Sequence, residues 1–290
     1  VIGDRRGFAS CHNWGSFYPL CRPVHGIPDT PATGAYHRQL EQALRDLPCV
    51  KLNPARARRF AQAAGTLAKT DKIDAAILAR IATTLQPPIR PATTPQQARL
   101  AELISARDSL VRDKIAIQNQ AKNLTVPLLK RQYKHRLDQI GRHIEQLDAE
   151  IATNVAADPA LARRHQIISS IAGVGARTAD QLIATMPELG ALEPKQAASL
   201  AGLAPVARQS GQWKGRSFIQ GGRANVRRAL YMPALVAARY NPDLKAKYKS
   251  LIAAGKPAKV ALVTLMRKLI VMANALIKAD RLWTADRACA

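Results

Sequence analysis

Apolar positions recur at helical spacing along most of this chain, and one short stretch near the N-terminus departs from that rule. The range 50–52 is a compact apolar run, which is typical of a short strand. Asn53-Pro54 follows it, and Asn before Pro is typical of a helix N-cap and the first helical position. We therefore expect a helix from Pro54 to about Gly65. An earlier helical stripe is formed by Leu40, Leu44 and Leu47.

The middle of the chain is charged and helical, and it follows a linker at residues 89–95 (IRPATTP). Five apolar residues there step by three and four positions, which is the a/d seam of a coiled coil. Two interpretations stay open at this point: an antiparallel helical hairpin that packs on itself, and an intermolecular coiled coil that joins copies of the chain. The seam consists of Leu137, Ile140, Ile144, Leu147 and Ile151.

The remainder of the chain is predicted to be helical throughout. Asp158-Pro159, Asn241-Pro242 and Lys256-Pro257 mark helix starts, and no strand pattern competes with them. Helix, strand, helix in the N-terminal part is the rhythm of an α/β layer, although residues 1–30 show no period. The predicted fold class is therefore α/β plus α, divided into residues 1–92, a helical connector at 93–157 and an all-helical domain at 158–290.

The charge of the chain indicates a polyanionic partner. The formal net charge is +24 and the isoelectric point is about 10.6, which favours nucleic acid. Residues 203–281 hold sixteen Lys or Arg and two acids, so the polyanion is expected there. We find no uninterrupted apolar run of about 18 residues and no secretory leader, which argues against a membrane. Four cysteines without CxxC spacing are expected to be free thiols in a reducing cytoplasm.

Two aspartates lie at the predicted start of the helix after Thr70. Asp71 and Asp74 are three positions apart, so they project from nearly the same face of a helix. Paired carboxylates suit Mg²⁺ or Mn²⁺, which can assist phosphoryl transfer. The alternative is structural, because acids in a first turn offset the helix dipole. Asp74 continues the apolar stripe of its helix, and from spacing alone the two interpretations are balanced.

Gly173-Val174-Gly175 lies between an apolar helix end and an Ala-rich helix start. This arrangement is typical of a helix-hairpin-helix, in which Gly173 and Gly175 would let the turn approach DNA and the next helix would offer free N–H groups to a phosphate. An ordinary glycine turn between packed helices is the alternative. A nucleotide-binding GxGxxG is excluded, because Thr178 occupies the third glycine position.

Ser210 lies on a glycine-flanked, basic loop. No histidine follows His165, and the Gly-x-Ser-x-Gly elbow is absent, so an esterase is disfavoured. Phosphoryl transfer has a different requirement, which is stabilisation of the negative charge that develops on the phosphate, and arginines can provide it. On the residues alone, however, a loop that holds DNA is the favoured interpretation. The basic residues of this region that are candidates for DNA contact are Arg208, Lys214, Arg216, Arg223, Arg227 and Arg228.

Together these features resemble the insertion-sequence transposases of the IS-one-ten group, which include bridge-RNA-guided recombinases. The resemblance runs from about Thr33 to Trp283. Its most specific stretches are Thr33 to Arg38 (TGAYHR), Leu67 to Ala75 (LAKTDKIDA), and Leu200 to Pro205 (LAGLAP) continuing through Tyr231.

The resemblance implies a RuvC-like (RNase H-like) domain with an Asp-Glu-Asp-Asp metal set, a coiled-coil connector that supports a homo-oligomer, and a helical C-terminal domain with a nucleophilic serine. By position, Asp71 and Asp74 would be the last two acids of the set and Ser210 the nucleophile. Two departures are visible. The position of the family's glutamate holds Pro31, and residues 1–30 contain no recognisable first strand with an aspartate. We therefore expect a truncated or degenerate metal domain and a copy with impaired activity.

The function that the resemblance implies is DNA transposition: cutting and rejoining of DNA strands at the ends of a mobile element and at a target chosen through a guide RNA. Two other classes stay open on the residues. A metal-dependent, structure-specific nuclease would cut without Ser210, and a non-catalytic DNA- or RNA-binding protein would bind with a steep salt dependence and never cut.

Overall fold

The computed structural model describes residues 29–31, 50–87, 94–207, 209–215 and 217–285. The chain divides into two compact units, 1–93 and 94–290. The predicted stripe at Leu40, Leu44 and Leu47 and the linker up to residue 93 lie outside the described residues, as do all four cysteines.

Unit 1–93 is a small α/β layer. The two strands among its described residues are parallel, with Asp29 opposite Val50 and Pro31 opposite Leu52. The core is formed by the strand Val50–Leu52 and the apolar faces of the helices Pro54–Ala63 and Asp71–Leu85. Parallel strands that share a core with helices form an α/β layer, so an α/β arrangement is confirmed for the described residues of this part. Its elements are β1 (Asp29–Pro31), β2 (Val50–Leu52), α2 (Pro54–Ala63) and α3 (Asp71–Leu85).

The two predicted helix starts in this unit are confirmed by their caps. The side-chain oxygen of Asn53 accepts a hydrogen bond from the backbone N–H of Ala55 at 2.8 Å. The Thr70 hydroxyl accepts one from the N–H of Ile73 at 3.3 Å. Each cap satisfies an N–H group that has no partner within the helix. The local sequence therefore determines where these helices begin.

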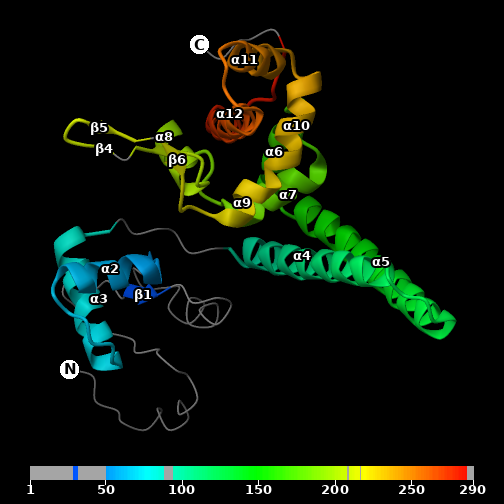
Figure 1. Ribbon diagram of the computed structural model, residues 1–290, viewed down its shortest axis with the longest axis horizontal. Coiled ribbons are helices and arrows are strands. Elements are labelled where there is room, and N and C mark those ends of the chain that lie inside the picture. Colours follow the sequence, from blue (N-terminus) through cyan, green and yellow to red (C-terminus); the bar gives the residue numbers. More distant parts are fainter. Residues whose placement is uncertain (1–28, 32–49, 88–93, 208, 216, 286–290) are drawn as a thin grey trace. The chain divides into compact units, whose positions relative to one another are not determined.

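The connector is a helical hairpin formed by α4 (Pro95–Ala121) and α5 (Pro127–Ala157). The two helices lie against each other along their length (Figure 1). All five residues of the predicted seam are buried or half-buried, and Ile144 and Ile151 are the most enclosed of them. The periodicity is thus confirmed, and the seam is covered by α4 of the same chain.

The rest of unit 94–290 is a bundle built around its longest C-terminal helix. That helix, α12, packs against α6, α8, α10 and α11. Asp158 and Asn241 cap helices as predicted, because their side chains accept hydrogen bonds from the N–H groups of Ala160 and Leu244. The helices are α6 (Pro159–Ser169), α7 (Ala176–Thr185), α8 (Pro194–Leu200), α9 (Ala224–Ala229), α10 (Tyr231–Tyr240), α11 (Pro242–Ala253) and α12 (Ala258–Lys278).

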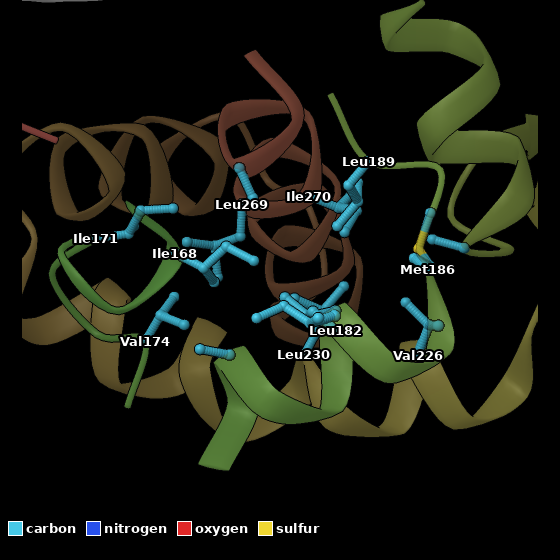
Figure 2. Packing of buried hydrophobic residues seen from close by; sticks show 14 of the residues in the cluster. Ile168, Ile171, Val174, Leu182, Met186, Leu189, Val226, Leu230, Leu269 and Ile270 are labelled. Carbon is cyan, nitrogen blue, oxygen red and sulfur yellow. The ribbon is translucent and has the colours of Figure 1, made fainter. Parts of the chain in front are cut away.

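The core of this bundle is aliphatic and continuous (Figure 2). Ile168 on α6, Ile270 on α12 and Leu230 between α9 and α10 are completely buried. Helix α12 is long and apolar enough to cross a membrane by composition, but half of its most apolar window is buried inside the bundle. Its apolar face is therefore accounted for by the core, and no membrane is indicated.

The prediction of an all-helical C-terminal domain is wrong for residues 205–219. Two antiparallel pairs occur there, β3 with β6 and β4 with β5. Each strand is two residues long, too short to show the alternation by which a strand is recognised in a sequence. The strands are β3 (Pro205–Val206), β4 (Gln209–Ser210), β5 (Trp213–Lys214) and β6 (Phe218–Ile219).

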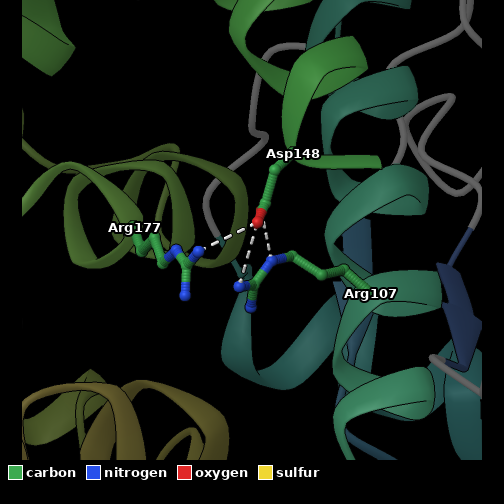
Figure 3. A network of polar contacts seen from close by, with 3 residues as sticks. All are labelled: Arg107, Asp148 and Arg177. Atoms are coloured by element: carbon green, nitrogen blue, oxygen red, sulfur yellow. Dashed lines mark hydrogen bonds and ion pairs between the residues drawn. The ribbon is translucent and has the colours of Figure 1, made fainter. Parts of the chain in front are cut away.

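The helical hairpin is joined to the bundle at the end where the chain enters and leaves it. Asp148 on α5 accepts hydrogen bonds from Arg107 on α4 and from Arg177 on α7 (Figure 3). Leu100 and Val155 of the hairpin belong to the core of the bundle. The predicted boundary between residues 157 and 158 therefore falls inside one compact unit, at the N-cap of α6.

Candidate functional site

Ser210 lies at the turn of a β-hairpin that projects from the bundle (Figure 1). It pairs with Trp213, and the two residues between them form the turn. Gly211 has φ +55, a value that suits glycine in a two-residue hairpin turn. The Ser210 residue is exposed, and its hydroxyl makes no hydrogen bond to any described residue. The tight turn of this hairpin thus exposes Ser210 to solvent.

The base of this hairpin is closed by direct contact between two glycine backbones. Gly202 and Gly222 have φ +70 and +62. A Cβ atom on Gly222 would collide with the backbone N and Cα of Gly202 and would lie 2.8 Å from the carbonyl oxygen of Leu200. The N–H of Arg223 also donates to that carbonyl at 2.8 Å. Residues 204–221 therefore leave and re-enter the bundle at one point, next to the buried core residue Leu203.

Two of the predicted DNA-contacting arginines stabilise this base. The Arg227 guanidinium donates to the carbonyl oxygen of Gly221 at 2.9 Å and to that of Gly202 at 3.4 Å. It therefore bridges the two sides of the base. Arg223 binds Glu188 through both carboxylate oxygens, at 2.6 and 2.8 Å, which is the strong bidentate form of an ion pair. In this structure these side chains hold the loop rather than point to solvent.

A second arginine supports the same acidic residue. Arg164 donates to the carbonyl oxygens of Pro187 and Leu189 on either side of Glu188. Burial lowers the pKa of Arg164, and the nearby carboxylate of Glu188 partly offsets that effect. The turn between α7 and α8 is thus held from two sides by arginines. Neither Glu188 nor Arg164 was predicted, although an acid inside so basic a region was a signal that could have singled out Glu188.

Four basic candidates near Ser210 remain: Arg208, Lys214, Arg216 and Arg228. Arg208 and Arg216 lie outside the described residues, and Lys214 belongs to β5. Arg228 is exposed on α9, and no described residue forms an ion pair with it. Residues 205–219 contain no histidine, aspartate or glutamate, so the hairpin itself carries no imidazole or carboxylate base. This arrangement does not fit an acyl-transfer triad.

The turn between α6 and α7 places its two glycines in different surroundings. Gly173 has φ +101, and a Cβ atom there would lie 2.8 to 2.9 Å from atoms of Ala237 on α10. Gly173 therefore allows the turn between α6 and α7 to approach α10 closely. Gly175 precedes α7, has no heavy atom near its Cβ position and leaves the first N–H groups of α7 without a side-chain cap. Only Gly175 belongs to an open surface.

Asp71 and Asp74 lie in the first turn of α3, in the other compact unit. Asp71 is exposed and Asp74 is half-exposed. Leu78 and Ile81 continue the helix into the core, so Asp74 lies at the rim of the apolar face. No cluster of three metal-ligating side chains occurs in the part of the chain that the structure describes. Two carboxylates are nevertheless compatible with Mg²⁺, which is commonly held by one or two carboxylates together with substrate phosphates and water.

Comparison with known proteins identifies the family to which these two units belong. The family described as "Transposase IS116/IS110/IS902 family" matches residues 165–249, and a DEDD-type IS110 domain described as "Transposase" matches residues 28–149. The pilin gene-inverting protein of Moraxella lacunata is 31% identical over 261 residues, which cover 86% of this chain and 79% of that protein. The chain belongs to the IS110 family of transposases.

Two further relatives agree with this assignment. The pilin gene-inverting protein of Moraxella bovis is 30% identical over the same 86% of this chain and 79% of that protein. An uncharacterized 43.6 kDa protein of insertion element IS110 from Streptomyces coelicolor is 32% identical over 135 residues, which cover 46% of this chain and 32% of that protein. This IS110-family transposase is therefore a DNA recombinase of a mobile element, and its DEDD-type domain indicates dependence on a divalent metal.

Proposed function

We propose that this IS110-family transposase cuts and rejoins DNA through a covalent bond to Ser210. The observation that carries the proposal is the exposure of Ser210 at the turn of a hairpin whose base is closed by Gly202 and Gly222. An exposed hydroxyl on a pinned element can reach a phosphodiester without rearrangement of the bundle.

In the proposed step, Oγ of Ser210 forms a bond to phosphorus while the bond from phosphorus to one deoxyribose oxygen breaks. The serine proton passes to a base or water, and the departing oxygen takes up a proton. The product is a phosphoserine ester and a free DNA hydroxyl. The number of phosphoester bonds is unchanged, so a second hydroxyl can attack the ester and rejoin the strands in a new combination.

The phosphates would be held by basic groups around the hairpin. Arg228 is exposed and unpaired among described residues, and Arg208, Lys214 and Arg216 flank Ser210 in sequence. The uncapped start of α7 after Gly175 offers further N–H donors for a phosphate. Arg223 and Arg227 act as positioning residues in this proposal, because they hold the base of the hairpin.

Asp71 and Asp74 would hold Mg²⁺ (or Mn²⁺) together with DNA phosphate oxygens. The ion would supply charge neutralisation for a phosphoryl transfer. The role of the two aspartates is to bind it through hard oxygen ligands, for which their spacing on one helix face is suited. This part of the proposal concerns metal binding by unit 1–93 alone.

The proposed reaction is an exchange between two DNA sites. It covers insertion of a mobile element and also inversion, the activity that the Moraxella relatives carry in their names. Selection of the target by a guide RNA, and assembly of copies through the helical hairpin, are further parts of the proposal that rest on the family resemblance.

A trapped covalent complex tests the nucleophile. The substrate is a radiolabelled duplex carrying the ends of the element, nicked so that a cut fragment diffuses away. A labelled protein band resistant to denaturation is expected, and it should disappear in Ser210→Ala. Ser217→Ala is the matched control, because Ser217 is an exposed serine in the same loop. Survival of the band in Ser210→Ala would refute the assignment.

The same experiment separates the alternatives. A nuclease that depends on metal alone would cleave the duplex with Ser210→Ala and would form no protein–DNA band. A non-catalytic binding protein would shift the duplex in a gel and leave it uncut with every variant.

A further inference from the structure

The helical hairpin carries a pronounced separation of charge between its two ends. Its tip, residues 114–137, contains six Lys or Arg and no acid. Its base, residues 95–113 and 138–157, contains four Lys or Arg and seven acids. The two parts of one element thus have net charges of +6 and −3 at neutral pH. Such a division is not required by a helical hairpin, whose stability comes from its apolar seam.

The acidic base has a structural use. Asp148 binds Arg107 and Arg177, and Asp108 accepts a hydrogen bond from Gln181 on α7 at 3.1 Å. The contacts of Asp148 and Asp108 with α7 join the hairpin to the bundle, and Figure 3 shows that of Asp148. Two of the seven acids of the base therefore take part in contacts between the hairpin and the bundle inside unit 94–290.

The basic tip has no comparable partner among the residues that the structure describes. Five of its six cations are exposed, and no ion pair involves any of the six among the described residues of the hairpin. Lys130, Arg131 and Lys134 lie within about 100° of one another around the helix axis, at 100° per residue. Like charges four residues apart, as in Lys130 and Lys134, destabilise a helix by a few tenths of a kcal/mol. These cations therefore do not serve the fold.

We propose that the hairpin tip, residues 114–137, is a second DNA-binding surface that contacts the phosphates of double-stranded DNA. Concentrated, exposed positive charge without specific pairing is what a regular polyanion attracts, because binding releases counterions. Helix α5 has 31 residues and so extends for about 46 Å at 1.5 Å per residue. The tip therefore reaches duplex phosphates about 13 base pairs away from DNA held at the bundle, taking 3.4 Å per base pair.

The aromatic content of the tip favours duplex over single-stranded nucleic acid. Proteins that hold single strands stack the bases on exposed aromatic rings. Tyr133 is the one Phe, Tyr or Trp residue of the tip, and it is half-buried and hydrogen-bonded to Gln120 at 3.3 Å. The guanidinium of Arg136 lies 5.8 Å from its ring centre. Its ring therefore offers no free stacking platform, and phosphate contact is the interaction that the tip supports.

The test is the salt dependence of binding to an uncut duplex. The full chain and the triple variant Lys130→Gln, Arg131→Gln, Lys134→Gln are titrated with a fluorescent 40-base-pair duplex of random sequence between 50 and 200 mM KCl. Loss of three phosphate contacts should reduce the slope of log K against log salt by about 2.7. Over this range the parent should therefore lose about 40-fold more affinity than the variant. Affinity at 50 mM should fall at least about tenfold.

The controls separate charge from folding and from catalysis. The charge-preserving variant Lys130→Arg, Arg131→Lys, Lys134→Arg should bind as the parent does, and thermal unfolding followed by circular dichroism should show all three proteins folded. An unchanged slope in the Gln variant would overturn the proposal. So would an equal or larger effect on a 40-nucleotide RNA or single-stranded DNA, which would assign the tip to single strands. Because the duplex stays uncut, failure here is independent of the role of Ser210.

Discussion

Alanine at Gly222 should open the base of the Ser210 hairpin, and alanine at Gly221 should not. Both glycines have positive φ, +69 at Gly221 and +62 at Gly222, so alanine at either costs about 1–2 kcal/mol of backbone strain. Only Gly222 faces another backbone: its added Cβ would lie under 3.0 Å from Gly202, whereas Gly221 has no atom within 4 Å. Forcing an atom into a packed site costs about another 1–3 kcal/mol.

The two substitutions therefore form a matched pair. Gly221→Ala should lower the free energy of unfolding by about 1–2 kcal/mol and Gly222→Ala by about 2–5 kcal/mol, the sum of strain and overlap. For a unit of this size the melting temperature falls by about 2–4 °C per kcal/mol. Urea denaturation with circular dichroism measures the difference. Trapping of DNA on Ser210 should also decline in Gly222→Ala and persist in Gly221→Ala.

Equal destabilisation by the two substitutions would refute this reasoning, because it would mean that the contact between Gly202 and Gly222 does not constrain the loop. Gly211→Ala extends the comparison. Gly211 also has positive φ and open space around it, so it should behave as Gly221 does in the unfolding measurement.

Three further predictions concern polar groups in unit 94–290. Arg223→Ala should cost about 1.5–3 kcal/mol in urea denaturation, because the largely buried Glu188 loses two charge-assisted hydrogen bonds; a loss below about 0.5 kcal/mol, the smallest value for an ordinary hydrogen bond, would contradict it. Burial raises the pKa of Asp180, so the folded state holds this proton more tightly than the unfolded chain does. Asp180 therefore contributes to the free energy of unfolding at low pH. This contribution is lost as the pH rises from about 3.8, the ordinary pKa of the group, through the raised pKa. Asp180→Asn should thus gain stability relative to the parent between pH 3.5 and 6, and a melting-temperature difference that stays constant over this range would rule the effect out. Asn274 is buried and bonds the N–H of residue 190 and the carbonyl of residue 192, so Asn274→Leu should cost about 2–4 kcal/mol. The buried Oδ1 of Asn154 has no partner among described residues, so Asn154→Leu should be neutral or stabilising. Similar losses from both leucine variants would show that these hydrogen bonds do not decide stability.

The local signals in the sequence predicted most helix starts well. Asn53, Thr70, Asp158 and Asn241 each cap a helix where the pattern placed one. A cap acts on N–H groups two or three residues away, so the information is contained in adjacent residues. The hairpin seam was predictable for a similar reason, because its period reports one buried face. Whether another copy or the same chain covers that face is not encoded in the period.

The sequence did not predict the strands around Ser210, because these strands depend on pairing between residues that are distant in the sequence. Two-residue strands carry no period, and the pairing of Pro205 with Ile219 joins residues fourteen positions apart. It depends on Gly202 and Gly222 meeting at the base of the loop. The spacing of the glycines alone gave no indication of that contact.

The structure gives several of the predicted DNA-contacting residues partners within the chain. Arg223, Arg227 and Gly173 were predicted to face DNA. The structure shows Arg223 bound to a carboxylate 35 positions earlier in the chain, Arg227 bound to loop carbonyls and Gly173 packed against Ala237. An arginine that binds an acid and one that binds a phosphate use the same chemistry, so only the three-dimensional partner distinguishes them. Ser210 itself was singled out by resemblance, since its spacing alone indicated a basic binding loop.

The closed base of the Ser210 hairpin makes residues 204–221 a separable module. Because the chain leaves and re-enters the bundle at Gly202 and Gly222, changes in the length or sequence of the intervening segment need not propagate into the helices. Exchange of this segment between relatives that keep both glycines should therefore give folded chimaeras. Variation in how such enzymes engage DNA can then accumulate in the segment while the scaffold that presents it stays constant.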